Sequence, residues 1–436
     1  MFSHVCNLTR IFLISRYLQV HLIVIFIQIV SVVIKSVKSE NMDKFLSFFC
    51  VFLIFHIIFC DAAVPYRISD IDMHPHINGE KSLTAKAITT SSINTDELTK
   101  EYWLENAIKL VTEKVNAIPN TNKAKKVILF VGDGMGLTTT AAARVVLGGE
   151  ESSLSFENFP HTASSKTYCL DKGVADSACS ATSFLHGVKT NNGMIGLNGF
   201  ARRSNCEDSN NTRLYTDSIA KWAQDKGMAI GVVTTTRITH ATPAGLYANT
   251  AERNWETNAE VIASSCDDYQ IDDIAEQLVT GEIGSKFKVI LGGGSRNFIN
   301  NNETEHESKG MRSDGRNLIN EWISKKSSRR FIRTRAELMD LNVDDEEDIF
   351  RLFSSDHLPY HLDVEDKKLV EVPSLEEMTM KAIQILDKVQ NGYFLMVEGG
   401  RIDHSHHNGE AKYALDETIE FSKAIQSAVE SVDLRD

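Results

Sequence analysis

Five side chains with metal-binding chemistry lie close together near the end of this 436-residue chain, in LMVEGGRIDHSHHNG at 395–409. They are Glu398, Asp403, His404, His406 and His407. Carboxylate oxygens and imidazole nitrogens are common protein ligands of zinc and related divalent metals. The alternative is a solvated turn of charged surface residues. The apolar run at 393–397 favours the metal interpretation, because a buried strand in an α/β sheet delivers the next residue to the edge where such sheets bind ligands.

A second candidate, Asp133, follows the apolar run at 126–131 within the sequence VGDGM. The flanking glycines let the backbone approach a ligand closely, so a carboxylate here suits a metal or phosphate site. Alternatively, Asp133 is a turn residue that caps the next helix. The motif is not the GxGxxG fingerprint of a dinucleotide site.

Ser177 lies in VADSACSATSF at 174–184, where small residues precede a helix-prone stretch. A serine at a helix N-terminus has free N–H groups beside it, which suit an incoming phosphate. The alternative is an ordinary N-cap, in which Asp176 or Ser177 satisfies backbone donors. A serine-hydrolase site fits poorly, because this stretch is not a GxSxG elbow.

The stretch TTTRITHATPAGLYANTAERNWE at 234–256 adds His240, Thr242 and Arg253. Pro243 and Gly245 indicate a turn after a strand, which would bring these side chains to the edge of a sheet. Taken singly, His240 is equally well explained as a structural histidine and Arg253 as a surface arginine.

Strands and helices must position these residues, and the sequence alternates between the two patterns. Apolar runs at 126–131, 229–233, 288–291 and 393–397 predict strands, and a capping-box pattern from Ser374 to Glu377 predicts the start of a helix. The alternation predicts an α/β fold with a central, largely parallel sheet flanked by helices on both faces. The polar stretch at 300–372 is expected to form an insertion or peripheral loops.

Charge and length exclude some classes of protein. Lys plus Arg is 46 and Asp plus Glu is 59, which gives a net charge of -13. No nucleic-acid binding is expected, because that function needs a basic surface. The chain is long enough for one large domain or two ordinary ones.

Two apolar segments, 17–34 and 45–60, occur near the N-terminus. The second predicts a secretory signal peptide at 42–62, which leaves 1–41 as a non-native or apolar extension and 63–436 as the folded domain. An exported protein can form disulfides and carry glycans. The relevant residues are Cys169, Cys179, Cys206 and Cys266, with sequons at Asn210 and Asn302.

Four motifs occur together in the order of one family, and the chain resembles the animal alkaline phosphatases from about residue 100 to its end. The motifs are VGDGMG, DSA-x-SAT, THATPAG followed by RNW, and VEGGRIDHSHH. The resemblance implies that family's fold and the hydrolysis of small-molecule phosphate monoesters. It also implies that Ser177 is the nucleophile that becomes phosphoserine and that Arg253 clamps two phosphate oxygens.

The same resemblance implies two zinc ions and one magnesium ion per subunit. The implied ligands are Asp133, Thr242 and Glu398 for magnesium, Asp133 and Ser177 for the second zinc, and Asp403 and His407 for the first zinc, with His240 and His404 next to these ligands. In the family, an Asp-His segment and a later histidine complete the two zinc sites, and this sequence ends at Asp436 before either.

We therefore expect an alkaline phosphatase domain whose C-terminal part is missing. The alternative is an inactive, secreted pseudophosphatase that binds phosphate or metal. By residue type Asp356, His357 and His361 could replace the missing ligands, but they lie in the polar stretch.

The resemblance also implies a Cys206–Cys266 disulfide and leaves Cys179 as a buried thiol. It implies a homodimer that is secreted or at the cell surface. A lipid anchor is possible in the full-length protein, although its signal is absent from this sequence.

Overall fold

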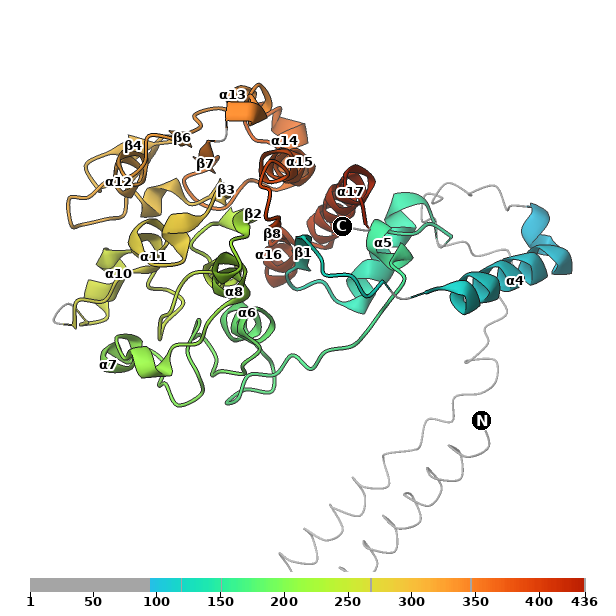
Figure 1. Ribbon diagram of the computed structural model, residues 1–436, viewed down its shortest axis with the longest axis horizontal. Helices are drawn as coiled ribbons and strands as arrows, with labels where there is room; N and C mark the ends of the chain where they lie inside the picture. The colour runs from blue at the N-terminus through green and yellow to red at the C-terminus, as the bar shows by residue number, and fades with distance from the viewer. Residues whose placement is uncertain (1–94, 119, 150, 267–268, 346, 435–436) are drawn as a thin grey trace, which may run out of the picture. The chain divides into compact units, whose positions relative to one another are not determined.

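A six-stranded parallel sheet forms the centre of the protein (Figure 1). The computed structural model describes residues 95–434, apart from 119, 150, 267–268 and 346. The predicted extension at 1–41 and the signal peptide at 42–62 lie outside the described residues. In spatial order the strands are β1 (Lys126–Gly132), β8 (Tyr393–Gly399), β2 (Ala229–Arg237), β3 (Val289–Gly293), β7 (Asp348–Leu352) and β6 (Arg329–Phe331).

Helices connect the strands and cover both faces of the sheet (Figure 1). The longer ones are α4 (Lys100–Asn116), α5 (Leu137–Gly148), α6 (Ser177–His186), α15 (Leu375–Leu386), α16 (Arg401–Asn408) and α17 (Ala411–Ser431). The shorter ones are α7 (Cys206–Ser209), α8 (Ile219–Asp225), α9 (Ala241–Ala244), α10 (Asn258–Ala263), α11 (Ile274–Thr280), α12 (Leu318–Ser324), α13 (Arg335–Met339) and α14 (His361–Lys367). A two-stranded antiparallel pair, β4 (Thr304–Glu305) and β5 (Ser308–Lys309), lies outside the main sheet.

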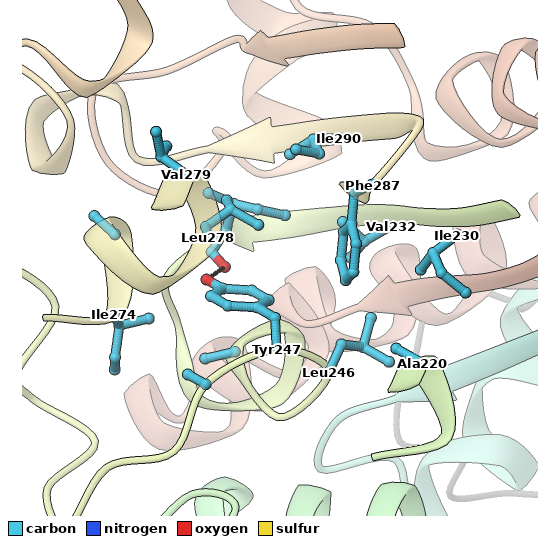
Figure 2. Close-up of a cluster of buried hydrophobic side chains, with 14 of the residues drawn as sticks. Ala220, Ile230, Val232, Leu246, Tyr247, Ile274, Leu278, Val279, Phe287 and Ile290 are labelled. Carbon is cyan, nitrogen blue, oxygen red and sulfur yellow. Dashed lines mark hydrogen bonds between the residues drawn. The ribbon is translucent and has the colours of Figure 1, made fainter. Parts of the chain in front are cut away.

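The strands β1, β8, β2, β3 and β7 supply side chains to two separate cores, because successive residues of a strand point to opposite faces. Ile230 and Val232 of β2 lie in the core that also contains residues of α6, α8, α11 and α12. Figure 2 shows this core, in which the ring centroids of Tyr247 and Phe287 are 6.0 Å apart. Val233 lies in the opposite core, with residues of α15, α16 and α17. Burying each such side chain contributes about 1.5–3 kcal/mol to folding, so the two cores fix the sheet between its helical layers.

The predicted fold class is confirmed: a parallel sheet carries helices on both faces. The four predicted strands are present as β1, β2, β3 and β8, and α15 begins with the predicted capping box at Ser374 and Glu377.

The expectation for 300–372 is wrong, because this stretch contains β6 and β7 of the main sheet. Charged residues hide the strand pattern of β7. Asp348 is buried there against Lys326 and Arg329, and the Arg351 guanidinium lies over the rings of Phe331 and Phe353. A buried strand with charged residues, whose partners lie on other segments, does not appear in the sequence as an apolar run.

Among the residues that the structure describes, no helix is long and apolar enough to cross a membrane. These residues belong to one compact unit, Thr90–Asp436.

Candidate active site

The sheet register brings the predicted site residues to one edge. β1 and β8 are neighbours, and Val131 is paired with Glu398. β2 lies on the other side of β8, with Thr234 paired with Glu398. The chain therefore leaves all three strands at the same carboxyl edge, where open α/β sheets bind their ligands. Asp133, Glu398 and the turn that contains His240 meet there.

Ser177 is the first residue of α6, and its hydroxyl donates a hydrogen bond to Asp133 Oδ2 at 2.9 Å. The N-cap of this helix is Asp176, whose Oδ1 accepts the backbone N–H of Cys179 at 3.2 Å. Because Asp176 caps the helix, the Ser177 hydroxyl is available for another partner. The ordinary N-cap interpretation therefore applies to Asp176 and not to Ser177.

A disulfide joins Cys169 to Cys179, two residues beyond Ser177. The expectation of a buried thiol at Cys179 is therefore wrong. The expected disulfide between Cys206 and Cys266 is confirmed. The number of cysteines could have predicted this disulfide. Four cysteines lie after the N-terminal apolar segments, and once Cys206 and Cys266 are paired, Cys169 and Cys179 can pair with each other.

Arg253 lies across the start of α6. Its Nη1 donates to Asp176 Oδ2 at 2.9 Å, and its Nη2 lies 3.0 Å from His240 Nε2. Burial, together with the charge of Arg253, holds the pKa of His240 well below its ordinary value. The imidazole is therefore neutral, and its Nε2 accepts a hydrogen bond from the guanidinium N–H. Asp176 and His240 hold the arginine beside Ser177, with 20% of its side chain exposed.

Glu398 is fully buried at the end of β8. Its Oε2 accepts hydrogen bonds from Thr234 at 2.5 Å and Thr236 at 3.1 Å, and the buried side chain of Thr242 lies beside the same carboxyl group. Its Oε1 is buried and has no hydrogen-bond partner among the described residues. Such an oxygen is costly in a dry interior unless a cation compensates it.

The buried carboxylates at this edge repel one another. Burial and the charge of Asp133 raise the pKa of Glu398, and burial and the charge of Asp403 raise that of Asp133. Both shifts indicate negative charge that protein groups do not neutralise. Oxygen donors from Asp133, Glu398 and Thr242 are the donor type that Mg²⁺ prefers. The residues present therefore fit a magnesium ion.

Asp403 and His407 lie one turn apart on α16, with 3.4 Å between Asp403 Oδ2 and His407 Nε2. The side chain of His407 is 78% exposed. Gly134, at φ +65°, lets the turn after β1 touch α16, because a Cβ atom there would lie 2.6 Å from Asp403 Oδ1. The structure thus brings Asp403 and His407 together beside the Asp133 turn, and an Asp/His pair suits zinc.

The other two histidines of α16 point elsewhere. His404 lies inside, where its Nδ1 is 2.9 Å from Arg401 Nη1 and its ring centroid is 5.3 Å from that of His240. His406 Nε2 lies 3.0 Å from the Thr139 hydroxyl.

The structure places Asp356 and His357 close to the predicted site residues. The His357 ring centroid lies 4.3 Å from that of His404 and 5.3 Å from that of His240. Arg237 holds both residues: its backbone N–H donates to His357 Nδ1 at 3.0 Å, and its Nη1 donates to Asp356 Oδ1 at 2.7 Å. Their position just after β7 was the missing signal, since the other site residues also follow parallel strands.

The predicted metal ligands meet in pairs. Ser177 contacts Asp133, and Asp403 contacts His407. Within the described part of the chain, three metal-type side chains lie within 4.8 Å of one another only at Cys169, Asp176 and Cys179, where the disulfide already occupies both sulfurs. None of the three predicted ligand sets contains three side chains of these types, so each set would need further ligands, such as water, to complete a metal site.

Fold and site together define an α/β protein with a serine, an arginine and buried carboxylates at the carboxyl edge of a parallel sheet. Residues 124–435 match the family described as alkaline phosphatase. The chain therefore belongs to the alkaline phosphatase family.

Similar proteins agree with this assignment. The chain is 41% identical over 363 residues to the membrane-bound alkaline phosphatase of Bombyx mori, a match that covers 80% of this chain and 65% of that protein. It is 40% identical to the tissue-nonspecific alkaline phosphatase of Homo sapiens, over 78% of this chain and 67% of the human protein. The chain thus spans about two thirds of the length of these relatives. The crystal structure of Thermus thermophilus alkaline phosphatase superposes with a TM-score of 0.56 at 26% identity, covering 73% of this chain and 59% of that chain.

Proposed function

We propose that the protein hydrolyses small-molecule phosphate monoesters through a phosphoserine at Ser177. The observation that carries this proposal is the hydrogen bond of the Ser177 hydroxyl to Asp133 at the start of α6, with Arg253 held next to it by Asp176. A nucleophile, a helix N-terminus and a guanidinium then face the same small volume. That combination suits a dianionic phosphoryl group.

In the proposed reaction the Ser177 Oγ attacks phosphorus, the bond from phosphorus to the alcohol oxygen breaks, and the leaving oxygen takes a proton from solvent. The hydrogen bond to Asp133 orients the hydroxyl and provides an acceptor for its proton. Arg253 binds two of the phosphoryl oxygens and stabilises their charge during transfer. Water then cleaves the bond between Oγ and phosphorus, which releases phosphate and restores the hydroxyl group.

We propose two zinc ions and one magnesium ion as cofactors. Asp133, Thr242 and Glu398 would hold magnesium, Asp403 and His407 one zinc, and Asp133 with Ser177 the other. When bound, these ions supply the positive charge that lowers the pKa of the serine hydroxyl and stabilises the transferring group. The buried Glu398 Oε1 without a hydrogen-bond partner supports a cation at that position.

The direct test of this function is the hydrolysis of p-nitrophenyl phosphate by protein supplied with zinc and magnesium. We expect turnover that inorganic phosphate inhibits competitively and that EDTA abolishes until metal is restored. Bis-p-nitrophenyl phosphate and p-nitrophenyl sulfate serve as controls, because Arg253 and α6 are placed for a terminal phosphoryl group. Faster hydrolysis of either control ester would contradict the proposal.

Glu398 gives a prediction that does not depend on activity. Its pKa is raised in the folded state, so its contribution to stability is present below the ordinary carboxyl pKa and is lost as pH rises through the folded pKa. In EDTA, Glu398→Gln should therefore become more stable than wild type as pH rises from 5 to 9, by on the order of 2 kcal/mol. Added Mg²⁺ should raise the melting temperature of wild type and not that of the variant. Urea and thermal unfolding measure both effects, and parallel pH profiles for the two proteins would contradict the assignment.

The disulfide next to the nucleophile gives another prediction. Cys169→Ser with Cys179→Ser should lower the free energy of unfolding by about 3 kcal/mol, because the denatured chain loses a loop constraint. It should also lower turnover per folded molecule. The disulfide fixes the position of Cys179, the Cys179 amide donates to Asp176, and Asp176 holds Arg253.

The second disulfide provides the matched control. Cys206→Ser with Cys266→Ser opens a longer loop, with a sequence separation of 60 residues, and should cost about 4 kcal/mol of stability. It touches neither Asp176 nor Arg253, so turnover per folded molecule should stay the same. Urea unfolding and active-fraction assays compare the two variants, and equal losses of turnover would show that the first disulfide does not position the site.

We further propose that residues 63–436 are an exported phosphatase domain, secreted or held at the cell surface, and that it forms a homodimer. Two disulfides support export, and Asn210 and Asn302 are exposed for glycosylation. Helix α4 has no buried residue, and its apolar side chains, including Leu104, Ile108 and Val111, are more than half exposed, which leaves a face for a second copy. Light scattering tests the dimer.

A further inference from the structure

A cavity of about 560 Å³ is lined by none of the proposed catalytic residues. Residues of α14, of the start of α15 and of α17 line it. His361, Glu365, Glu417 and Glu420 are among the lining residues. The mechanism proposed above uses none of them.

Asp416 holds one ring nitrogen of His361. The Nδ1 atom lies 2.9 Å from Asp416 Oδ2, so the Nδ1–H donates to the carboxylate and Nε2 is left for other partners. This carboxylate–histidine pairing orients the ring and makes the second nitrogen a better metal ligand. Nε2 has two carboxylate oxygens near it, Glu420 Oε2 at 3.6 Å and Glu365 Oε1 at 3.9 Å.

Those separations are close to what a bound metal requires. Two ligand atoms about 2.0–2.1 Å from a tetrahedral zinc ion are about 3.3 Å apart. The observed distances of 3.6 and 3.9 Å from Nε2 exceed that value by only a few tenths of an ångström. The two carboxylates lie farther from each other, because no three metal-type side chains among the described residues of this cavity lie within 4.8 Å of one another. Glu365 has 70% of its side chain exposed, so it can swing toward Glu420 without repacking.

The surrounding charge also favours a cation. Glu417 is 5% exposed, and its Oε1 accepts the backbone N–H of His361 at 2.7 Å. Lys423 pairs with Glu420 Oε1 at 2.5 Å, which leaves Oε2 facing His361. Arg335 and Lys368 also line the cavity, and Arg335 is paired with Glu377. Acidic side chains still outnumber these two basic ones, since Glu365, Glu376, Glu377, Glu417 and Glu420 all line the cavity.

We propose that this cavity binds a divalent transition-metal ion with the ligand preference of Zn²⁺, through His361 Nε2, Glu365 and Glu420. Asp416 is the positioning residue that orients the imidazole. An imidazole with two carboxylates suits zinc better than magnesium or calcium, which take oxygen ligands alone. Tyr360, next to His361, lies against the Arg401 guanidinium at 3.8 Å, so the ion would stabilise the segment that carries His357 to the active site.

The test counts zinc in purified protein after equilibrium dialysis at a fixed free Zn²⁺ concentration. The variants are His361→Gln and Glu420→Gln, and Glu430→Gln is the control because it makes the same charge change at an exposed position of α17. Each variant is also made in a background with Asp403→Asn and His407→Gln, which weakens the proposed catalytic zinc.

We expect His361→Gln and Glu420→Gln to hold one zinc fewer per chain than wild type or Glu430→Gln, in both backgrounds. Zinc should also raise the melting temperature of the Asp403/His407 background, and adding His361→Gln should remove that rise. Equal zinc counts in all variants would overturn the proposal and leave an ion-pair cluster only. If Asp403→Asn with His407→Gln lowers the zinc count, and His361→Gln or Glu420→Gln does not lower it further, the metal belongs to the catalytic site and the proposal is wrong. Circular dichroism in EDTA confirms that each variant is folded before its zinc is counted.

Discussion

Ser177→Ala is expected to lower kcat/KM for p-nitrophenyl phosphate by about 10,000-fold or more, because it removes the atom that forms the covalent intermediate. The variant should remain folded, since Asp176 and not Ser177 caps α6. Ser180→Ala is the matched control: it makes the same change one turn further along the helix. Steady-state kinetics with identical metal loading compares the three proteins.

An equal loss in Ser180→Ala would mean that the helix, and not the Ser177 hydroxyl, carries the effect. Retention of more than about one hundredth of wild-type activity in Ser177→Ala would require a different nucleophile, such as an activated water.

Arg253→Ala is expected to lower kcat/KM by about 100- to 1,000-fold and to weaken inhibition by inorganic phosphate, because it removes donors aimed at the phosphoryl oxygens. Zinc content should stay at the wild-type level, since the guanidinium contacts Asp176 and His240 and no predicted metal ligand. Arg253→Lys should recover only part of the loss, because an ammonium group cannot donate two parallel hydrogen bonds.

Arg213→Ala is the control, because Arg213 is exposed and lies on a different surface segment. Elemental analysis and phosphate inhibition are measured on the same samples. Loss of zinc from Arg253→Ala would show that the arginine supports the metal site and does not act on phosphate.

The sequence predicted those parts of the site in which a polar residue directly follows an apolar run. Asp133 and Glu398 are of this kind, and because neighbouring parallel strands end at one edge, they had to lie close together. Ser177 was predicted from its small neighbours and its position before a helix. Resemblance to a family supplied the roles of Arg253 and Asp403, which no local pattern provides.

The missed features depend on pairing between distant residues. The charge of Arg351 interrupts the apolar pattern of β7, and Asp348 at the start of the strand is paired with Lys326 from another segment. Without that strand, Asp356 and His357 had no reason to be near the active site. The Cys169–Cys179 disulfide likewise depends on where an extended segment passes the start of α6.

The His361 cluster could not be found from sequence for the same reason. It joins α14 to α17. Asp416 and Glu420 of α17 lie 55 and 59 positions after His361 along the chain. Neither the spacing nor the composition of either segment marks it as a metal site.

The central claim is that the reaction passes through a phosphoserine at Ser177, and acid quench of the working protein tests it most directly. Metal-loaded protein is mixed with isotopically labelled inorganic phosphate at mildly acidic pH, quenched in acid, digested, and its peptides are sequenced by mass spectrometry. We predict that wild type carries the label on Ser177 and that Ser180→Ala does too, whereas Ser177→Ala carries none. Label on another residue, or label that persists in Ser177→Ala, would contradict the account.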